Sequence, residues 1–292
     1  MSIQRRSFLW YSLLFLAGCN SATGTHNTKL PERLRFAVTD VKGLEELRRN
    51  YEPFRLALEE VIETEVQFYP VENYLAAASA LQLNQVDLVL AGPSEYVVIH
   101  SRSNAVPIVA LTRPNLRTVI AVRQDSGIKS VSDLQGKTIE IGKLSSTTAH
   151  IGPVKILLDA GLDPKSDVEL IRSKDYGIQR LKTGEVDAWT RASHRYIKAL
   201  QAEGLSEYDY PLIATSPPLP NDIFVASSHL DSQIVEKISD RILTNQSKLL
   251  AALLSVEAFA TKFKGATLVE ARDSDYNMIR EVYRAIGQDD FI

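Results

Sequence analysis

Short apolar segments with the pattern of buried strands alternate with helical segments along most of the chain. The strand-like segments lie at 34–40, 65–71, 86–92, 105–113, 117–124, 138–142, 168–173, 184–189, 210–216 and 223–228. In the first helical segment the apolar residues recur three or four positions apart and therefore share one face; they are Leu47, Tyr51, Phe54 and Leu58. Alternation of this kind predicts parallel sheets with helices on both faces, so the expected fold class is α/β.

The alternation occurs twice, which predicts two α/β lobes joined by crossings of the chain. The crossings are expected near 124–127 and in the proline-rich stretch 217–221. Lobe 1 then comprises residues 34–124 and 217–292, and lobe 2 comprises residues 125–216. Ligands of open parallel sheets bind beyond the carboxyl ends of the strands. Two lobes that face each other through these ends would form a cleft that can close on a ligand.

The N-terminus has the layout of an export signal. Two arginines precede a short apolar run, which ends in Leu16-Ala17-Gly18-Cys19 and is too short for an ordinary transmembrane helix. This ending resembles a bacterial lipobox, so we expect residues 1–18 to be a signal peptide, Cys19 to be lipidated and residues 19–33 to be a flexible tether. The alternative is an N-terminal helix with an incidental cysteine. A lipid anchor would place the protein outside the cytoplasmic membrane, on its periplasmic side.

Charge and motifs argue against several classes of function. The formal net charge is -3 and the isoelectric point is near 6.0, and the chain has no long basic run, which argues against nucleic-acid binding. It has no GxSxG elbow, no HExxH motif and no Cys/His spacing typical of a metal site. Cys19 is the only cysteine, so no internal disulfide can form. We therefore expect a monomeric binding protein without enzymatic activity, cofactor or metal.

Four consecutive hydroxyl side chains lie between the strand-like segment 138–142 and the next helix; they are Ser145, Ser146, Thr147 and Thr148. The first N–H groups of a helix have no internal partner, and the helix dipole favours an anion there. With added hydroxyl donors, such an end can bind a tetrahedral oxyanion without a lysine or a metal. Alternatively, the run caps the helix and lines a polar loop, and Ser145 fits this role most easily. Spacing alone leaves both interpretations open, and the run lacks the glycines and lysine of a P-loop.

Together these stretches resemble the substrate-binding proteins of phosphonate, phosphite and phosphate ABC transporters. The resemblance rests on Ser146-Thr147-Thr148-Ala149 followed by Pro153, and on the order of YEPFRLALEEVIETEV, VDLVLAGPSEYV, SVSDLQGKTIEIG and GEVDAW. It covers about 34–290 and implies a two-lobe, type II-like periplasmic binding protein with its ligand cleft between the lobes. Such a protein captures a phosphorus oxyanion and hands it to an ABC permease, without covalent chemistry.

The resemblance also implies which residues bind the ligand. Tyr74 is similar to a tyrosine that hydrogen-bonds the phosphonyl group, and Ser146, Thr147 and Thr148 match the hydroxyl cradle. Asp222 matches an acidic residue of the pocket. Tyr96 belongs to a common GP-x-x-Y pattern and either contacts the ligand or packs beneath the site. Upstream of Tyr74, Asn73 is expected to cap the helix that the tyrosine begins.

Two positions bear on the identity of the ligand. Aminophosphonate binders of the family use carboxylates to hold the ligand ammonium, but seven residues after Asp187 this chain has His194. This favours phosphite, phosphate or a simple alkylphosphonate, unless His194 is only a surface residue.

A carboxylate at Asp222 would repel an anion unless a proton lies between them. Asp222 would then accept from a P–OH group and discriminate against sulfate, unless it is a solvated loop residue.

Several other side chains have two interpretations. Arg117 and Arg191 are either anion partners or surface arginines. His150 either touches the ligand or faces the cleft, and Trp189 either narrows the pocket or packs at the end of a strand.

Two further functions remain open for the whole chain. It could bind another small solute, such as a sulfonate, nitrate or a thiamine precursor, or it could be a sensor lipoprotein that partners a membrane kinase.

Overall fold

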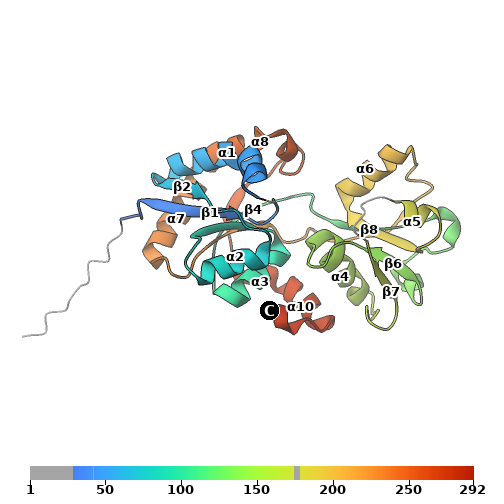
Figure 1. Cartoon of the computed structure of the whole chain (residues 1–292). Helices are drawn as coiled ribbons and strands as arrows, with labels where there is room; N and C mark the ends of the chain where they lie inside the picture. Colours follow the sequence, from blue (N-terminus) through green and yellow to red (C-terminus); the bar gives the residue numbers. More distant parts are fainter. Residues whose placement is uncertain (1–28, 42, 174–177) are drawn as a thin grey trace, which may run out of the picture.

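The computed structural model describes residues 29–41, 43–173 and 178–292. The predicted signal peptide, the lipidation site at Cys19 and most of the predicted tether lie outside the described residues. Figure 1 shows two bodies, each built around one sheet. The fold is therefore α/β with two lobes, as the alternation of segments predicted. Within the described residues, no helix is both long enough and apolar enough to cross a membrane.

Lobe 1 is built around a six-stranded mixed sheet with the order β11-β4-β10-β3-β1-β2. Its strands are β1 (Arg33–Val38), β2 (Glu65–Phe68), β3 (Leu88–Ala91), β4 (Val106–Leu111), β10 (Asp222–Ala226) and β11 (Leu268–Glu270). β1 is parallel to β2 and β3, whereas β10 is antiparallel to β3 and β4. β3 and β4 consequently end at the edge of the sheet where β10 begins.

Lobe 2 is built around a five-stranded sheet with the order β7-β6-β8-β5-β9. Its strands are β5 (Thr118–Val122), β6 (Thr138–Ile141), β7 (Glu169–Arg172), β8 (Ala188–Ala192) and β9 (Leu212–Thr215). β6 is parallel to β7 and β8, while β5 is antiparallel to both β8 and β9. β6 and β8 therefore end at one edge, and the loops that follow them lie at that edge.

The position of β5 differs from the expected lobe limits, which placed residues 34–124 in lobe 1. β5 pairs with β8 and β9 and is buried along its whole length. The apolar pattern identified the strand but contained no information about its partners, which come later in the chain. The chain therefore passes between the sheets before Thr118, and it returns between β9 and β10.

Helices cover both faces of each sheet. In lobe 1 they are α1 (Gly43–Ile62), α2 (Tyr74–Gln82), α3 (Pro93–Ser103), α7 (Ser232–Thr244), α8 (Gln246–Leu254), α9 (Glu257–Ala260), η4 (Asp273–Tyr276), α10 (Asn277–Ala285) and η5 (Asp289–Phe291). In lobe 2 they are η1 (Gln124–Ser126), η2 (Val131–Leu134), the π-helical turn η3 (Thr147–Ile151), α4 (Gly152–Asp159), α5 (Gln179–Lys182) and α6 (Ser193–Glu203).

The lobes are joined by packing as well as by the two crossings. The apolar cluster between the lobe 1 sheet and helices α2, α3 and α10 also includes Ile151 and Val154 of lobe 2, which are both fully buried. Figure 1 shows α4 lying next to α10. Because complete burial of one such side chain contributes about 1.5–3 kcal/mol, this contact fixes the start of α4 against lobe 1.

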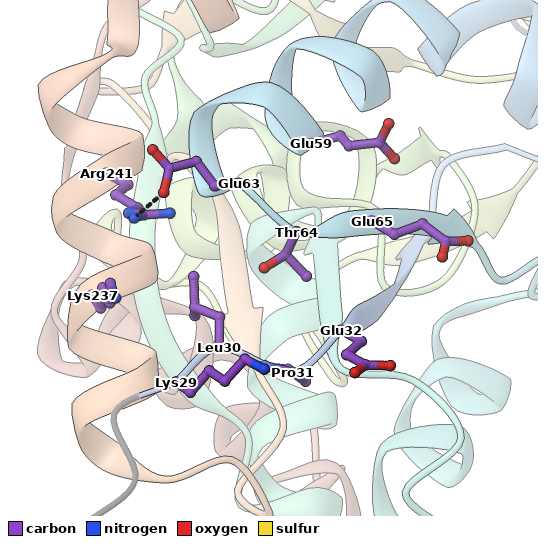
Figure 2. Close-up of a pocket in the computed structure, with 10 residues that line it drawn as sticks. All are labelled: Lys29, Leu30, Pro31, Glu32, Glu59, Glu63, Thr64, Glu65, Lys237 and Arg241. Carbon is purple, nitrogen blue, oxygen red and sulfur yellow. Dashed lines mark hydrogen bonds and ion pairs between the residues drawn. The ribbon is translucent and has the colours of Figure 1, made fainter.

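A groove of about 620 Å³ lies at the edge of the lobe 1 sheet where β1 and β2 begin (Figure 2). Its wall includes Lys29 and Glu32 of the entering chain, and Lys237 and Arg241 of α7. Arg241 pairs there with Glu63, at 2.6 Å. The loops after β1, β3 and β4 lie at the opposite edge, so this groove is separate from the predicted ligand cleft.

Candidate functional site

The four consecutive hydroxyls have different surroundings. Ser145 is buried and has a left-handed backbone with φ of 62°, which is uncommon outside glycine. Its hydroxyl accepts a hydrogen bond from the Tyr74 hydroxyl at 3.3 Å, and its carbonyl accepts one from the hydroxyl of Ser94. Ser146 is the cap, because its hydroxyl accepts from the Ala149 N–H at 3.3 Å. Ser145 therefore lies in the loop, one of the two roles that the sequence suggested for it, and Ser146 caps the helix.

Thr147 connects the hydroxyl run to lobe 1. Its hydroxyl lies 2.9 Å from the hydroxyl of Ser94 and accepts from the Ser94 N–H at 3.3 Å. Ser94 is in the first turn of α3, where the N–H groups and the helix dipole favour negative charge. Tyr74 begins α2, capped by Asn73 as predicted. The N-terminal ends of α2 and α3 thus meet the hydroxyl run of lobe 2.

Thr148 is positioned through its backbone. Its carbonyl accepts from the Thr118 hydroxyl of β5 at 2.7 Å, and its side chain is half-buried. A Cβ added at Gly152 would lie 2.1 Å from the Thr118 hydroxyl oxygen and 2.9 Å from its Cβ. Only glycine allows the start of α4 to lie this close to β5. Gly152 therefore allows the end of the hydroxyl run to pack closely against the sheet of lobe 2.

Two further hydroxyls belong to this cluster, and the sequence did not indicate either of them. Ser94 is almost fully buried and holds both Ser145 and Thr147, as described above. Tyr283 of α10 is fully buried, and its hydroxyl has no hydrogen-bond partner among the described residues. Burial raises the pKa of Tyr283 to about 12, while the neighbouring Ser145 hydroxyl acts to lower that pKa. The sequence gave no signal that Tyr283 lies near Ser145, because α10 begins more than a hundred residues after the hydroxyl run.

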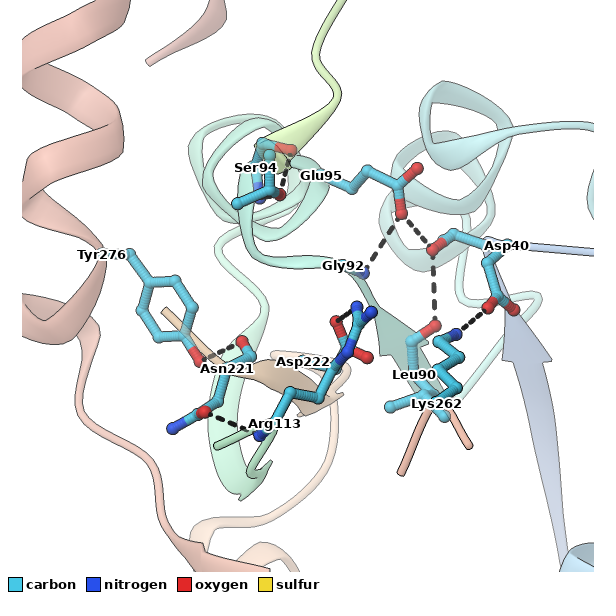
Figure 3. A network of polar contacts seen from close by, with 12 residues as sticks. Asp40, Leu90, Gly92, Ser94, Glu95, Arg113, Asn221, Asp222, Lys262 and Tyr276 are labelled. Atoms are coloured by element: carbon cyan, nitrogen blue, oxygen red, sulfur yellow. Dashed lines mark hydrogen bonds and ion pairs between the residues drawn. The ribbon is translucent and has the colours of Figure 1, made fainter. Parts of the chain in front are cut away.

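A second polar cluster lies at the adjoining edge of lobe 1 (Figure 3). Asp222, at the start of β10, pairs with Arg113, which follows β4; the Nη1–Oδ1 distance is 3.5 Å. Asp40, which follows β1, accepts from Lys262 at 2.5 Å and from the Tyr51 hydroxyl at 3.0 Å. The structure thus provides Asp222 with a cation from the protein itself, which the sequence did not predict.

Glu95 completes this cluster. One oxygen of its carboxyl group accepts from the hydroxyl of Thr39 and from the Gly92 N–H at 3.1 Å. Burial raises the pKa of Glu95, and the charges of Asp40 and Asp222 act in the same direction. Burial also acts to raise the pKa of Asp40, but the adjacent Lys262 outweighs it and the pKa is lowered. Asp40 is therefore ionised at neutral pH.

His194 is the second residue of α6 and is exposed. Desolvation by the surrounding protein lowers its pKa, and the positive charges of Arg113, Arg195 and Lys262 act in the same direction. Because its ordinary pKa is about 6.5, the imidazole is neutral at pH 7. The start of α6 therefore lies within electrostatic reach of Arg113 and Lys262 in the second polar cluster.

Two other side chains considered from the sequence are hydrogen-bonded elsewhere, and a third is buried with one ring nitrogen unpartnered. Tyr96 is fully buried against Tyr276, and its hydroxyl donates to Asp273 at 2.7 Å, so it packs beneath the site. Arg117 is half-buried, and its guanidinium donates to the Ser216 carbonyl at 2.8 Å, beside the crossing of the chain. His150 is buried in η3, and its Nδ1 has no partner among the described residues.

Arg191 is not a surface residue. It is fully buried and pairs with Glu140 at 2.7 Å, and its guanidinium lies 4.9 Å from the ring of Trp189. Trp189 is also fully buried, so it packs inside lobe 2. Glu140 is in β6 and Arg191 is in β8, so the pair joins the two strands that lead to the hydroxyl run and to His194. Within the described ranges, no three His, Cys, Asp or Glu side chains are grouped so as to hold a metal ion.

Comparison with known proteins identifies the family. The family model for periplasmic substrate-binding proteins of phosphonate ABC transporters matches residues 36–276. The chain belongs to this family. A member of the family works outside the cytoplasm as the substrate-binding component of an ABC transporter, so this phosphonate-binding family member acts on the extracytoplasmic side of the membrane.

Two relatives of the family member are similar to it over most of their length. One is the phosphate-import protein PhnD of Mycolicibacterium smegmatis, which is 20% identical over 94% of this chain and 92% of its own length. The other, from Prochlorococcus marinus, is named "Probable ABC transporter phosphite binding protein PhnD1". It is 20% identical over 88% of this chain and 91% of its own length.

Solved structures show the same fold. PhnD1 of Prochlorococcus marinus in complex with methylphosphonate superposes with a TM-score of 0.64 at 19% identity, over 89% of this chain and 100% of PhnD1. XAC2383 of Xanthomonas citri bound to ATP gives a TM-score of 0.70 at 15% identity, over 89% of this chain and 98% of XAC2383. At these identities the comparison establishes the fold, and the ligand must be argued from the residues of this chain.

Proposed function

We propose that this family member captures a phosphorus oxyanion, namely a phosphonate, phosphite or phosphate, in the cleft between the lobes. The observation that supports this most is the meeting of the α3 N-terminus with the hydroxyl run, through Ser94 and Thr147. Hydroxyls and backbone N–H groups from both lobes converge there, which is the donor set that a tetrahedral oxyanion requires. The relatives named for phosphate and phosphite support the same ligand class.

The proposed ligand contacts are four of the hydroxyls that the resemblance implied, with one addition. Ser146, Thr147 and Thr148 of lobe 2 and Tyr74 of lobe 1 provide hydroxyls, and Ser94 joins them. Binding between the two lobes would draw them together and exclude water, which strengthens hydrogen bonds to a charged ligand. Release to the permease would then require the lobes to move apart beyond the α4 contact, so the proposed activity is transport without covalent chemistry or a cofactor.

The remaining parts of the proposal concern the state of the protein in the cell. We propose that Cys19 is lipidated after removal of residues 1–18, that residues 19–33 tether the two lobes to the membrane, and that the protein works as a monomer. The lipobox-like stretch Leu16-Ala17-Gly18-Cys19 supports the anchor.

Metabolic labelling with a radioactive fatty acid would test the lipidation of Cys19, because Cys19→Ser must abolish labelling if the cysteine carries the lipid.

Calorimetry of the purified two-lobe protein tests the ligand class. The panel consists of phosphite, methylphosphonate, 2-aminoethylphosphonate, phosphate and sulfate. We expect at least one phosphorus ligand to bind with a measurable heat and to raise the melting temperature, since a ligand that binds only the folded state stabilises it. If no phosphorus compound gives heat or a thermal shift, the proposed function is wrong.

Replacing Thr147 with valine should weaken binding of the preferred phosphorus ligand. Valine keeps the shape but removes the hydroxyl, and loss of one hydrogen bond to a charged ligand costs about 1.5 kcal/mol or more, which is roughly tenfold in the dissociation constant. Thr244→Val, at an exposed position at the end of α7, makes the same chemical change away from the cleft and serves as the control. Equal affinities of the two variants would show that Thr147 only links the lobes.

A further inference from the structure

We propose that Arg113 and Lys262 make the cleft selective against ligands with a cationic substituent, because they pair with the carboxylates that such a substituent would otherwise contact. This inference rests on the proposed function, and it concerns the part of the ligand that extends beyond the oxyanion. It assigns a specificity role to two residues that the sequence did not single out.

The need for counter-charges follows from the placement of three carboxyl groups. Asp40, Glu95 and Asp222 follow or begin three different strands, β1, β3 and β10, and lie at one edge of the lobe 1 sheet (Figure 3). Carboxylates gathered in a partly buried place attract cations and repel anions, because water screens the charges less there. With these groups alone, the edge would favour a ligand that carries an ammonium group.

The protein itself supplies counter-charges to two of these three carboxyl groups, Asp222 and Asp40. Arg113 lies 3.5 Å from Asp222, and Lys262 lies 2.5 Å from Asp40. The Asp222 side chain is only 8% exposed and that of Arg113 is 16% exposed, so solvent has little access to this pair. An ammonium on the ligand would have to compete with the guanidinium for Asp222, and breaking a buried ion pair is strongly unfavourable.

Both cations are held in place by the same aromatic ring. The Arg113 guanidinium lies 5.9 Å from the ring centre of Phe263, and the Lys262 ammonium lies 4.6 Å from it. The backbone N–H of Arg113 also donates to the Asn221 side chain at 3.1 Å. Phe263 is almost fully buried, so the ring is a fixed support. The two side chains are therefore built-in parts of the edge and do not move freely in solvent.

The two cations lie close enough to lobe 2 to act on the charge of one of its side chains. Together with desolvation, the charges of Arg113 and Lys262 lower the pKa of His194 at the start of α6. Their field therefore reaches across to the other lobe. Residue 194 is a neutral histidine and not a carboxylate, so it offers no counter-charge to an ammonium group of the ligand. The positive field of lobe 1 opposes the binding of such a group.

The experiment compares two ligands of almost equal shape, 2-aminoethylphosphonate and propylphosphonate, which differ by an ammonium in place of a methyl group. Calorimetry gives the ratio of their dissociation constants for the wild-type protein, Arg113→Gln and Lys262→Gln. We expect the wild type to prefer propylphosphonate. Arg113→Gln should shift the ratio about tenfold or more toward the amino compound, because it uncovers the Asp222 carboxylate. Lys262→Gln, at a more exposed pair, should shift the ratio in the same direction by a smaller factor.

Two controls separate charge from other effects of substitution. Arg113→Lys keeps a cation beside Asp222 and should restore most of the wild-type ratio. Arg102→Gln removes a charge from an exposed position at the other end of α3 and should leave the ratio unchanged. If Arg113→Gln does not fold, the ratio of dissociation constants measured for Lys262→Gln tests the inference by itself.

Three outcomes would overturn the inference. The first is an unchanged ratio in every folded glutamine variant, and the second is an Arg113→Lys ratio equal to that of Arg113→Gln. The third is a wild-type protein that binds the amino compound more tightly. Failure of the proposed function looks different, because the wild-type protein would then bind none of the phosphorus ligands.

Discussion

Replacing Arg191 with methionine is expected to lower the free energy of unfolding by about 3–5 kcal/mol, the usual cost of removing one partner of a buried ion pair. Glu140, which is 1% exposed, would remain in the interior of lobe 2 without the arginine that lies 2.7 Å from it. Urea unfolding followed by circular dichroism measures the loss. An effect below about 1 kcal/mol, typical of an exposed pair, would contradict the buried geometry.

A second variant distinguishes the unpaired charge from lost packing. Glu140→Met combined with Arg191→Met leaves no charge in the core, so it should recover most of the stability that Arg191→Met loses. Burial raises the pKa of Glu140, and the positive charge of Arg191 opposes this effect. Without Arg191, Glu140 should take up a proton more readily. The single variant should therefore lose less stability, relative to the wild type, in mildly acidic buffer than at neutral pH.

The ion pair also matters for the site. It joins β6 to β8, whose ends carry the hydroxyl run and the start of α6. If Arg191→Met remains folded, the ends of these strands should be less well fixed, and binding of the phosphorus ligand should weaken although Arg191 does not touch the cleft. Ligand affinity of the stable double variant close to that of the wild type would show that packing alone is sufficient to position the two loops.

Acidification is expected to destabilise the protein through His150. Burial lowers the pKa of His150 to about 4, and the charge of Arg172 acts in the same direction. The unfolded chain takes up the proton near pH 6.5, whereas the folded protein does so only near pH 4. Stability from this residue is therefore complete above about pH 6.5 and is lost as the pH falls toward 4. The loss at pH 4 amounts to about 3 kcal/mol.

The measurement compares the wild type with His150→Leu by urea unfolding across this pH range. Other groups titrate in both proteins, so the difference between the two curves isolates His150. The wild type should lose more stability than the variant between pH 7 and pH 4, by about 3 kcal/mol. Parallel curves would show that the imidazole is accessible to water in the folded state.

The sequence predicted those parts of the site that depend on neighbouring residues. Asn73 was expected to cap the helix that begins at Tyr74, and its side chain accepts from the N–H groups of Leu75 and Ala76. The hydroxyl run was expected between a strand and a helix N-terminus, and it extends from the loop after β6 into the first two residues of η3. These features follow from side-chain chemistry at fixed short spacing, which a single sequence displays directly.

The sequence could not predict contacts between distant segments. Ser94 and Thr147 are 53 positions apart, and Arg113 and Asp222 are 109 positions apart. No periodicity connects such pairs, because the partners are chosen by how strands order themselves in a sheet. Arg191 is the sharpest example. An arginine at the end of a strand is usually exposed, and only the pairing of β6 with β8 shows that a glutamate lies beside it in the core.

The direction of β1 has a mechanical consequence. β1 carries the chain from Arg33, beside the groove of Figure 2, to Val38, just before Asp40 at the ligand edge. Its six residues span about 20 Å. With the chain anchored at Cys19 as proposed, tension from the membrane enters lobe 1 at the end farthest from the cleft. Lobe 2 bears none of that tension, so the membrane anchor does not oppose its movement toward a captured ligand.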